Sequence, residues 1–376
     1  MDSPPPLRSL EPFRLERYFA AHEFQAPIHL CASDCETLAV DELLALEPGA
    51  REALLRLRLG YTESAGAPEL RREIAGLYAE LGAGDVLVHA GGEEVIWTLF
   101  AAGVGPGDRV AVHLPCYQSL ATLPRAFGAE VLPLATRHEE GWMLAPEQVA
   151  EALERGAGWV VLNLPHNPTG WLMAEPELRA IAGLCRDAGA RLVVDEVYRG
   201  LEHDPADRLP CAADLDPSFV SIGVTSKSWG LPGLRIGWLA TRDAGLLARV
   251  AAMKDYTTIC AAGPSELLAT VALRHTGRIH EANRRRCAAN ATLLAAFVER
   301  HADRFELVAP AAGSVAFPRL RDPGADVERF CDGLRRDHGI LLLPGTLVEA
   351  GSRAFRVGLG REGFAAGLAA LEQALA

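Results

Sequence analysis

The stretch SIGVTSKSWGLPGLRIGW, residues 221–238, decides the fold of this chain. It begins as a run of small and β-branched residues ending at Thr225-Ser226, which predicts a buried strand. Lys227 follows at once, and a glycine-rich turn then leads to Arg235. Burial lowers the pKa of an ammonium group, and a neutral amine can attack a carbonyl to form an imine. Taken alone, Lys227 is more simply interpreted as a surface lysine after a strand, so its role depends on the rest of the chain.

Alternating strand and helix patterns precede this stretch from residue 86 onward. Repeated β-α units of this length predict an α/β fold, with a mostly parallel sheet covered by helices on both faces. In such sheets the ligand binds beyond the carboxyl ends of the strands. Polar residues gather at the predicted strand ends, namely Gly91-Gly92-Glu93, Tyr117, Asn167, Asp195, Tyr198, Ser226 and Lys227.

The length of 376 residues predicts one large and one small domain. An amphipathic pattern over residues 10–24 predicts a first helix, and the prolines before it predict a loose N-terminal arm. We assign residues 1–45 to this arm and part of the small domain. Residues 46–264 form the predicted large domain, and residues 265–376 form the smaller C-terminal α/β domain.

The composition argues against several classes of protein. A formal net charge of -12 disfavours nucleic acid and anionic membranes as partners. The apolar runs are short and interrupted, and the N-terminus has no apolar core typical of a secretory signal. The eight cysteines form no CxxC pair, and no histidine–carboxylate spacing indicates a metal site. We therefore expect a cytoplasmic protein with reduced thiols, without metal, and without nucleic acid or membrane as partners.

Four residues predict a phosphate site. Gly92 and Glu93 open a helix, and the backbone N–H groups of a helix N-terminus bind phosphate. The hydroxyl of Ser226 and the guanidinium of Arg235 add further donors.

The other strand-end residues suit the ring of pyridoxal 5′-phosphate. Asp195 can hold a proton on a pyridine nitrogen, and Asn167 and Tyr198 can hydrogen-bond a phenolate oxygen. Tyr117 can stack on the ring, and Lys227 can form an imine with its aldehyde. Such a ring is an electron sink for a carbanion.

With these residues, the chain resembles a class I/II aminotransferase of the pyridoxal-phosphate superfamily with the aspartate-aminotransferase fold. The resemblance covers most of the chain and rests on seven motifs in the family's order. They are YTESAGAPELR, AGGEEVI, PCYQSL, NLPHNPTG, VVDEVYRGL, SKSWGLPGLRIGW and FRVGLGR.

The resemblance implies the same cofactor contacts, with the Schiff base on Lys227 and with Asp195 and Tyr198 at the ring. It also implies that Arg356 binds the substrate α-carboxylate, and that Tyr61 reaches the phosphate of a partner subunit in a homodimer. Each assignment has a simpler alternative. Asp195 could be a solvated strand end, Asn167 a turn residue before proline, and Arg356 part of a structural ion pair.

The chain departs from the family pattern at two places. Val224 stands where a phosphate-binding serine is common, so that one contact is either missing or supplied by Thr225. The segment ASDCE, residues 32–36, is acidic and supplies Ser33 and Glu36 as candidate substrate ligands. It resembles a subgroup that includes capreomycidine synthase-like proteins, which act on arginine derivatives. Asp34, Glu36 and Glu63 together predict a substrate with a cationic side chain.

The predicted activity is transamination between an L-amino acid and a 2-oxo acid. Lys227 acts first as the imine-forming amine and then as general acid and base at the α-carbon. The alternative is a pyridoxal-phosphate-dependent lyase, cyclase or oxidase acting on an amino acid such as an arginine derivative. A non-catalytic ligand-sensing protein is a third hypothesis, which the intact set of cofactor residues disfavours.

Overall fold

The computed structural model describes residues 10–351 and 353–375 of the chain. The predicted loose arm falls largely on residues 1–9, which lie outside the described residues. The predicted first helix is present over Arg14–His22 (α1).

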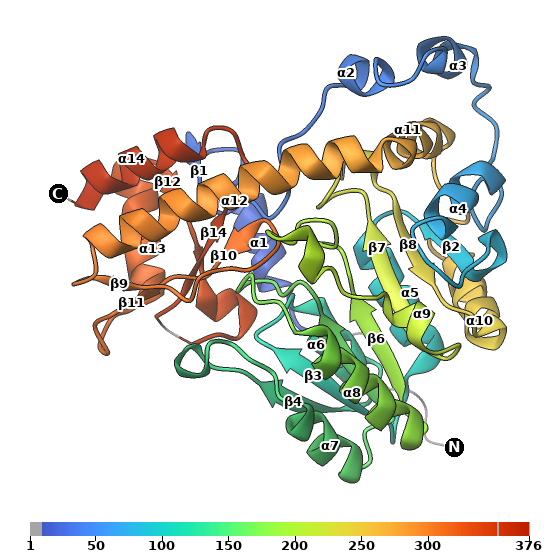
Figure 1. Ribbon diagram of the computed structural model, residues 1–376, viewed down its shortest axis with the longest axis horizontal. Helices are drawn as coiled ribbons and strands as arrows, with labels where there is room; N and C mark the ends of the chain where they lie inside the picture. Colours follow the sequence, from blue (N-terminus) through green and yellow to red (C-terminus); the bar gives the residue numbers. More distant parts are fainter. Residues whose placement is uncertain (1–9, 352, 376) are drawn as a thin grey trace.

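A seven-stranded sheet forms the centre of the large part of the molecule (Figure 1). Its strand order is β2-β8-β7-β6-β5-β3-β4, and β8 alone runs antiparallel to its neighbours. The predicted α/β fold with a mostly parallel sheet is therefore confirmed. The strands are β2 (Val86–His89), β3 (Arg109–Leu114), β4 (Glu130–Ala135), β5 (Trp159–Asn163), β6 (Arg191–Asp195), β7 (Val220–Val224) and β8 (Gly237–Ala240).

The reversed direction of β8 matters for the site. Gly237, its first residue, pairs with His89 at the end of β2 and with Val224 at the end of β7. An antiparallel strand therefore begins at the edge where its parallel neighbours end. This brings Arg235 to the same edge as Lys227.

Helices cover both faces of the sheet, because alternate strand residues point to opposite sides. Val161 and Val193 pack on one layer of helices, whereas Val160 and Val194 pack on the other. The first layer contains α5 (Gly92–Gly103), α6 (Ser119–Ala126) and α10 (Ala244–Lys254), and the second contains α7 (Pro146–Glu154), α8 (Glu175–Asp187) and α9 (Ala212–Leu215).

Four further helices lie near the β2–β8 edge. Trp229 and Trp238 pack there with α4 (Pro68–Ala75) and α11 (Gly263–Arg274). A helix beginning at Pro68 was predicted, and proline suits the first helical turn because its missing N–H would lack an intrahelical partner. In Figure 1, α2 (Val40–Leu44) and α3 (Ala50–Arg56) stand out from the body.

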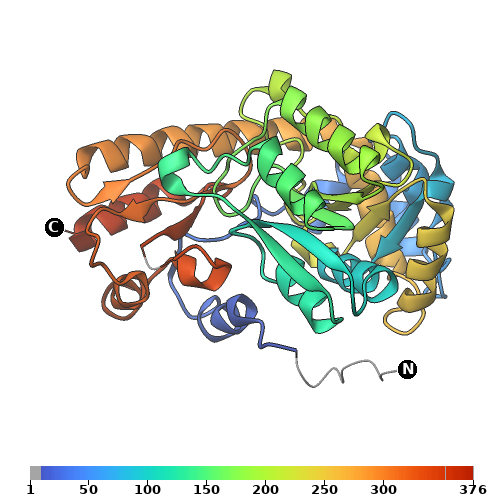
Figure 2. The ribbon, with the colours of Figure 1, turned by 90° about the horizontal axis from the view of Figure 1, so that it is seen from below.

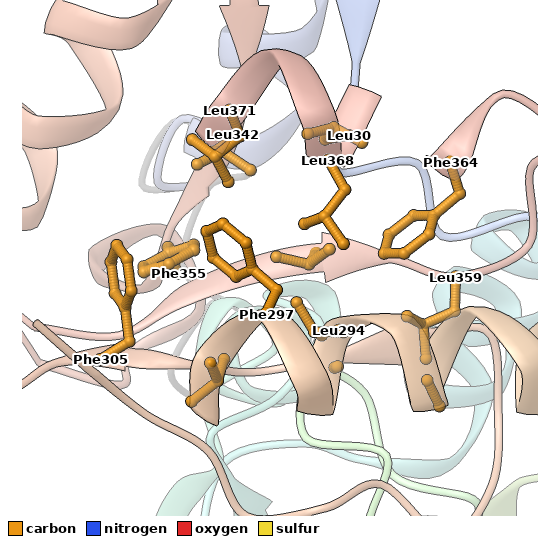
Figure 3. Packing of buried hydrophobic residues seen from close by; sticks show 14 of the residues in the cluster. Leu30, Leu294, Phe297, Phe305, Leu342, Phe355, Leu359, Phe364, Leu368 and Leu371 are labelled. Atoms are coloured by element: carbon orange, nitrogen blue, oxygen red, sulfur yellow. The ribbon is translucent and has the colours of Figure 1, made fainter. Parts of the chain in front are cut away.

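The C-terminal part contains short strands and three helices around a separate core. Leu294, Phe297, Phe305, Phe355 and Phe364 point toward one another in it (Figure 3), and burial of each such side chain stabilises the fold by about 1.5–3 kcal/mol. Its elements are β9 (Phe305–Glu306), β10 (Val315–Ala316), β11 (Arg319–Leu320), β12 (Ile340–Leu341), β13 (Leu343–Pro344), β14 (Phe355–Gly358), α12 (Thr276–Arg300), α13 (Val327–His338) and α14 (Phe364–Leu375), with β1 (Ile28–His29) of the N-terminal segment paired to β12.

We propose the three-part division given above, whose second boundary between residues 264 and 265 lies at the start of α11. The next helix, α12, connects the large part to the C-terminal part. Trp229 donates a hydrogen bond to Thr276 at the start of this helix, whereas Leu294 and Phe297 near its end belong to the C-terminal core. Figures 1 and 2 show α12 running from one part to the other. In the described residues, no helix combines the length and apolar character needed to cross a membrane.

Candidate active site

A cavity of about 580 Å³ opens where the carboxyl ends of the strands meet the N-terminal and C-terminal segments. It brings together most of the residues predicted from the sequence. The predicted residues that line it are Ser33, Gly92, Glu93, Tyr117, Asn167, Asp195, Tyr198, Ser226, Lys227, Arg235 and Arg356.

The end of the cavity at α5 is built to hold an anion. Gly91 has a φ of +93°, and a Cβ placed on it would lie 2.4 Å from Nη2 of Arg235. A Cβ on Gly237 would lie 2.7 Å from the carbonyl carbon of Gly91. Only glycine therefore permits the guanidinium to approach the N-terminus of α5 so closely. A helix N-terminus beside a guanidinium suits a phosphate.

The orientation of Thr225 shows whether this residue can supply the phosphate contact that Val224 lacks. Its hydroxyl is buried and donates to the carbonyl oxygen of Ile236 at 3.3 Å, on the side away from the cavity. Val224 lines the cavity wall instead. Thr225 therefore does not take over the phosphate contact that Val224 lacks.

Asp195 is the last residue of β6 and is 5% exposed. Its carboxylate accepts a hydrogen bond of 3.2 Å from the backbone N–H of Val197, and burial raises the pKa of Asp195 to about 7. A buried carboxylate of this kind is stabilised by a partner that carries a proton. The alternative of a solvated strand end is thus excluded by its burial.

The strand ends are held in place by Asn163, which the sequence did not single out. Its amide donates to the carbonyl oxygen of Asp195 at 2.8 Å, and its Oδ1 accepts from the backbone N–H of Asn167 at 2.7 Å. Asn163 ends the apolar run of β5. A polar residue at the end of an apolar strand was the feature of the sequence that could have indicated it.

Two tyrosines face the cavity. Within residues 10–351 and 353–375, the buried hydroxyl of Tyr198 has no hydrogen-bond partner. A buried hydroxyl without a partner is costly, so an acceptor on a bound molecule would stabilise it. The hydroxyl of Tyr117 donates to Glu16 at 3.1 Å, which connects the sheet edge to α1.

Lys227 lies in the cavity, and its Nζ donates a hydrogen bond of 2.7 Å to Oγ of Ser33. Burial lowers the pKa of its amine, which raises the neutral fraction that can act as a nucleophile. Lys254 is the only other lysine in the sequence, and its amine is occupied by the carbonyl oxygens of Ser64 and Ile259 at 2.7 Å each. Lys227 is thus the one lysine amine available to this cavity.

Arg356 is 2% exposed. Its guanidinium donates to the carbonyl oxygen of Cys31 at 3.0 Å and to Oδ1 of Asn167 at 3.2 Å. Among the described residues no carboxylate pairs with it, so the alternative of a structural ion pair is not supported. A buried cation without an anion is poised for an anionic ligand.

The acidic segment has a different role from the one predicted. Arg361 donates to Asp34 at 2.7 Å and to Glu36 at 3.2 Å. Asp34 lines the cavity, but Glu36 does not, and its carboxylate also accepts from the backbone N–H of Glu362 at 3.0 Å. We correct the assignment of Glu36 accordingly, because its carboxylate is committed to the C-terminal segment.

Other residues lie outside this cavity or were not predicted. Tyr61 is 93% exposed and lies outside the cavity of its own chain. Glu63 pairs with Arg71 at 2.9 Å and also lies outside it. Lining residues that the sequence did not indicate include Glu16, Phe19 and Glu23 of the first helical segment, together with Arg361.

These observations fit pyridoxal phosphate. The glycine cradle with Arg235 suits the phosphate, the buried carboxyl of Asp195 suits a protonated ring nitrogen, and the unpartnered hydroxyl of Tyr198 suits a ring oxygen. In the described part of the chain, no group of histidine, cysteine or acidic side chains is arranged to hold a metal ion.

Comparison with known proteins agrees with this site. Residues 26–363 match the family described as Aminotransferase class I and II. Capreomycidine synthase from Streptomyces vinaceus is 32% identical over 382 residues, which cover 98% of this chain and 94% of that protein. Valine–pyruvate aminotransferase from Mycobacterium tuberculosis is 30% identical over 305 residues, which cover 79% of this chain and 77% of that protein.

A pyridoxal-phosphate-dependent aminotransferase from Streptococcus suis has the same fold, with a TM-score of 0.91 and 28% identity over 98% of each chain. The described residues, the family match and this likeness lead to one conclusion. The chain belongs to the class I and II aminotransferase family, whose enzymes depend on pyridoxal phosphate.

Proposed function

We propose that the protein moves an amino group between an L-amino acid and a 2-oxo acid, with Lys227 as the catalytic amine. The observation that carries this proposal is the position of Lys227 in one cavity with Asp195 and Arg356. Bound pyridoxal phosphate supplies an electron sink that stabilises negative charge at the α-carbon of the amino acid. The remaining steps depend on side chains of this chain.

The cofactor is held at two ends. Arg235, Ser226 and the N-terminus of α5 at Gly92-Glu93 bind its phosphate. Asp195 keeps a proton on the ring nitrogen, since its buried carboxylate gains a charged partner.

The ring itself is fixed by three further residues. Tyr117 lies against its face. Asn167 and Tyr198 hydrogen-bond its oxygen, and Asn167 also contacts Arg356. Tyr198 thereby gains the partner that its buried hydroxyl lacks.

Substrate orientation and proton transfer fall to Arg356 and Lys227. The guanidinium binds the α-carboxylate of the amino acid by parallel hydrogen bonds. This places the α-carbon beside the amine of Lys227, which then removes and returns a proton as general base and general acid. The hydroxyl of Ser33 accepts a hydrogen bond of 2.7 Å from this amine.

A second candidate function is cyclisation, elimination or oxidation of an amino acid such as an arginine derivative. It is favoured by the likeness to capreomycidine synthase over 98% of the chain. The likeness to valine–pyruvate aminotransferase favours transamination. A purely ligand-sensing role is less well supported, because Lys227 and Asp195 both line the cavity.

A single-turnover experiment separates the two candidates. The holoenzyme is mixed with one equivalent of amino acid without a 2-oxo acid. Transamination converts the cofactor to pyridoxamine phosphate and releases a 2-oxo acid. If the cofactor returns to the aldehyde form with a cyclised or eliminated product, the second function is correct.

We further propose a cytoplasmic homodimer in which Tyr61 reaches the phosphate of the partner subunit. Tyr61 and Leu59 are almost fully exposed, and Leu55 largely so. All three follow or belong to the projecting segment that carries α2 and α3 (Figure 1). Large exposed side chains on a projecting segment are typical of an interaction surface.

A further inference from the structure

Helix α1 forms one wall of the cavity. Leu15, Glu16 and Phe19 on this helix, and Glu23 directly after it, line the cavity. Glu16 lies about one turn before Phe19 and Glu23 about one turn after it, so all three share a face. The wall therefore presents an aromatic ring between two carboxylates.

Among residues 10–351 and 353–375, neither carboxylate has an arginine or lysine partner. Glu16 accepts only the hydroxyl of Tyr117 at 3.1 Å, and the one ion-pair contact of Glu23 in the described residues is with His29 at 3.8 Å. Burial lowers the pKa of His29, which leaves that imidazole largely neutral at pH 7. Burial and the like charges of Asp34 and Glu16 raise the pKa of Glu23. Two acids of this kind favour a bound cation nearby.

Under the proposed function, the other charged side chains that line the cavity each have a partner on the cofactor, on the substrate or within the chain. Arg235 faces the phosphate, Arg356 faces the α-carboxylate, and Asp195 faces the ring nitrogen. Arg361 is neutralised by Asp34. Glu93 is the one further acid in the lining, and burial raises its pKa to about 7, so that it holds a proton much of the time.

We propose that Glu16 and Glu23 form the subsite for a positively charged substrate side chain, so that the amino donor is a basic amino acid. This inference rests on the proposed function. The basic group is a guanidinium or ammonium at the end of an unbranched chain.

The geometry of α1 supports the length of that chain. The guanidinium carbon of Arg356 lies 5.8 Å from the ring centre of Phe19, so the bound α-carboxylate is placed near this residue. The acids lie about one helical turn away on either side, roughly 5.4 Å along the axis. The methylene stem of an arginine or lysine side chain covers such a distance while packing on apolar surface. Phe19 and Leu15 supply that surface.

Recognition thus comes from acids other than those indicated by the sequence. Asp34 and Glu36 are paired with Arg361, and Glu63 is paired with Arg71. These three carboxylates already have cationic partners. In the part of the chain that the structure describes, Glu16 and Glu23 have no arginine or lysine partner.

The test is a spectral titration of the holoenzyme with L-arginine and L-citrulline, which have nearly the same shape but differ in charge. Arginine is expected to bind about tenfold more tightly than citrulline, as a charge pair in a shielded site requires. L-glutamate is expected to bind more weakly than either. Turnover of each amino acid with a 2-oxo acid is measured in the same preparations.

Variants locate the effect. Glu16→Gln and Glu23→Gln are each expected to reduce the ratio of arginine to citrulline affinity by about threefold or more. The double variant is expected to bring the ratio close to one. Glu11→Gln is the matched control, because Glu11 is exposed just before α1 and does not line the cavity. Its ratio is expected to equal that of the wild type.

The outcomes distinguish a failure of the Glu16–Glu23 subsite from a failure of the proposed aminotransferase function. If citrulline and arginine bind and react equally in the wild type, the subsite is wrong and the aminotransferase function stands. If arginine is preferred but both glutamine variants keep the full ratio, the recognition lies elsewhere and the subsite is also wrong. If no amino acid changes the spectrum or is turned over, the proposed function fails and the subsite fails with it.

Discussion

The amine of Lys227 donates a 2.7 Å hydrogen bond to the hydroxyl of Ser33, which lies 194 residues earlier in the chain. The backbone oxygen of Ser33 in turn accepts from Oγ of Ser314 at 2.6 Å. The candidate catalytic lysine is therefore held by the N-terminal segment, which is itself anchored to the C-terminal part. Movement of that segment would change the position of the amine.

Replacement of Ser33 by alanine should lower kcat about twofold to tenfold, the value of one hydrogen bond. The KM for the amino acid should change little, because Arg356 still binds the carboxylate. Steady-state kinetics with saturating 2-oxo acid measures both constants, and Ser33→Thr should restore most of kcat. A rise in KM with constant kcat would show that Ser33 binds substrate rather than orienting Lys227.

Replacement of Arg356 by lysine should lower kcat/KM by about 30-fold or more, since an ammonium cannot form the paired hydrogen bonds of a guanidinium. The cofactor absorbance should be unchanged, because Arg356 is proposed to contact the substrate. Kinetics and the visible spectrum of the same sample check this. Loss of the cofactor with normal substrate affinity would contradict the assignment.

The raised pKa of Asp195 should make the stability of the cofactor-free protein depend on pH. Its pKa is about 7 in the folded chain against 3.8 for an ordinary aspartate. The folded state therefore binds this proton more tightly, and the contribution to stability is lost as pH rises from about 4 to 7. Asp195→Asn cannot ionise, so its stability relative to the wild type should increase by about 2–3 kcal/mol between pH 5 and pH 8.

Urea unfolding of both cofactor-free proteins at the two pH values measures this difference. Groups that titrate equally in both proteins cancel in the comparison. A difference that stays constant from pH 5 to pH 8 would show that Asp195 is already ionised at pH 5 in the folded chain.

Tyr61 is predicted to act in the other subunit of the dimer. Tyr61→Phe should weaken pyridoxal phosphate binding roughly tenfold, the value of one hydrogen bond to a charged group. In a mixed dimer of Tyr61→Phe and Lys227→Ala subunits, one site has an intact lysine and receives an intact tyrosine from its partner. That site should bind the cofactor as tightly as the wild type does. Affinity as weak as in the Tyr61→Phe homodimer would show that Tyr61 acts within its own subunit.

The residues at strand ends could be predicted from the sequence because each follows an apolar run of recognisable period. Asp195, Asn167 and Lys227 are of this kind, and the parallel sheet brings their strand ends to one edge. The helices at residues 14–22 and from Pro68 were also predictable from their pattern.

The other side of the site was not predictable for a physical reason. The pairing of Glu36 with Arg361 joins residues 325 positions apart. The packing of the N-terminal segment against the sheet edge and the C-terminal core determines that the face of α1 carrying Glu16 is turned toward the cavity. Neither the ion pair nor the orientation of α1 depends on local periodicity. The sequence therefore suggested that Asp34 and Glu36 were free to bind substrate, whereas both carboxylates pair with Arg361.

The central claim is that Lys227 forms the covalent bond to pyridoxal phosphate. Reduction of the holoenzyme with borohydride, followed by proteolysis and mass spectrometry, tests it directly, because Lys227 and Lys254 are the only two lysines. The reduced cofactor is expected on the peptide that contains Lys227, with Lys254 unmodified. Lys227→Ala is expected to lose the visible absorbance and at least about 10²-fold in turnover. Label on Lys254, or absorbance and turnover retained by Lys227→Ala, would contradict the account.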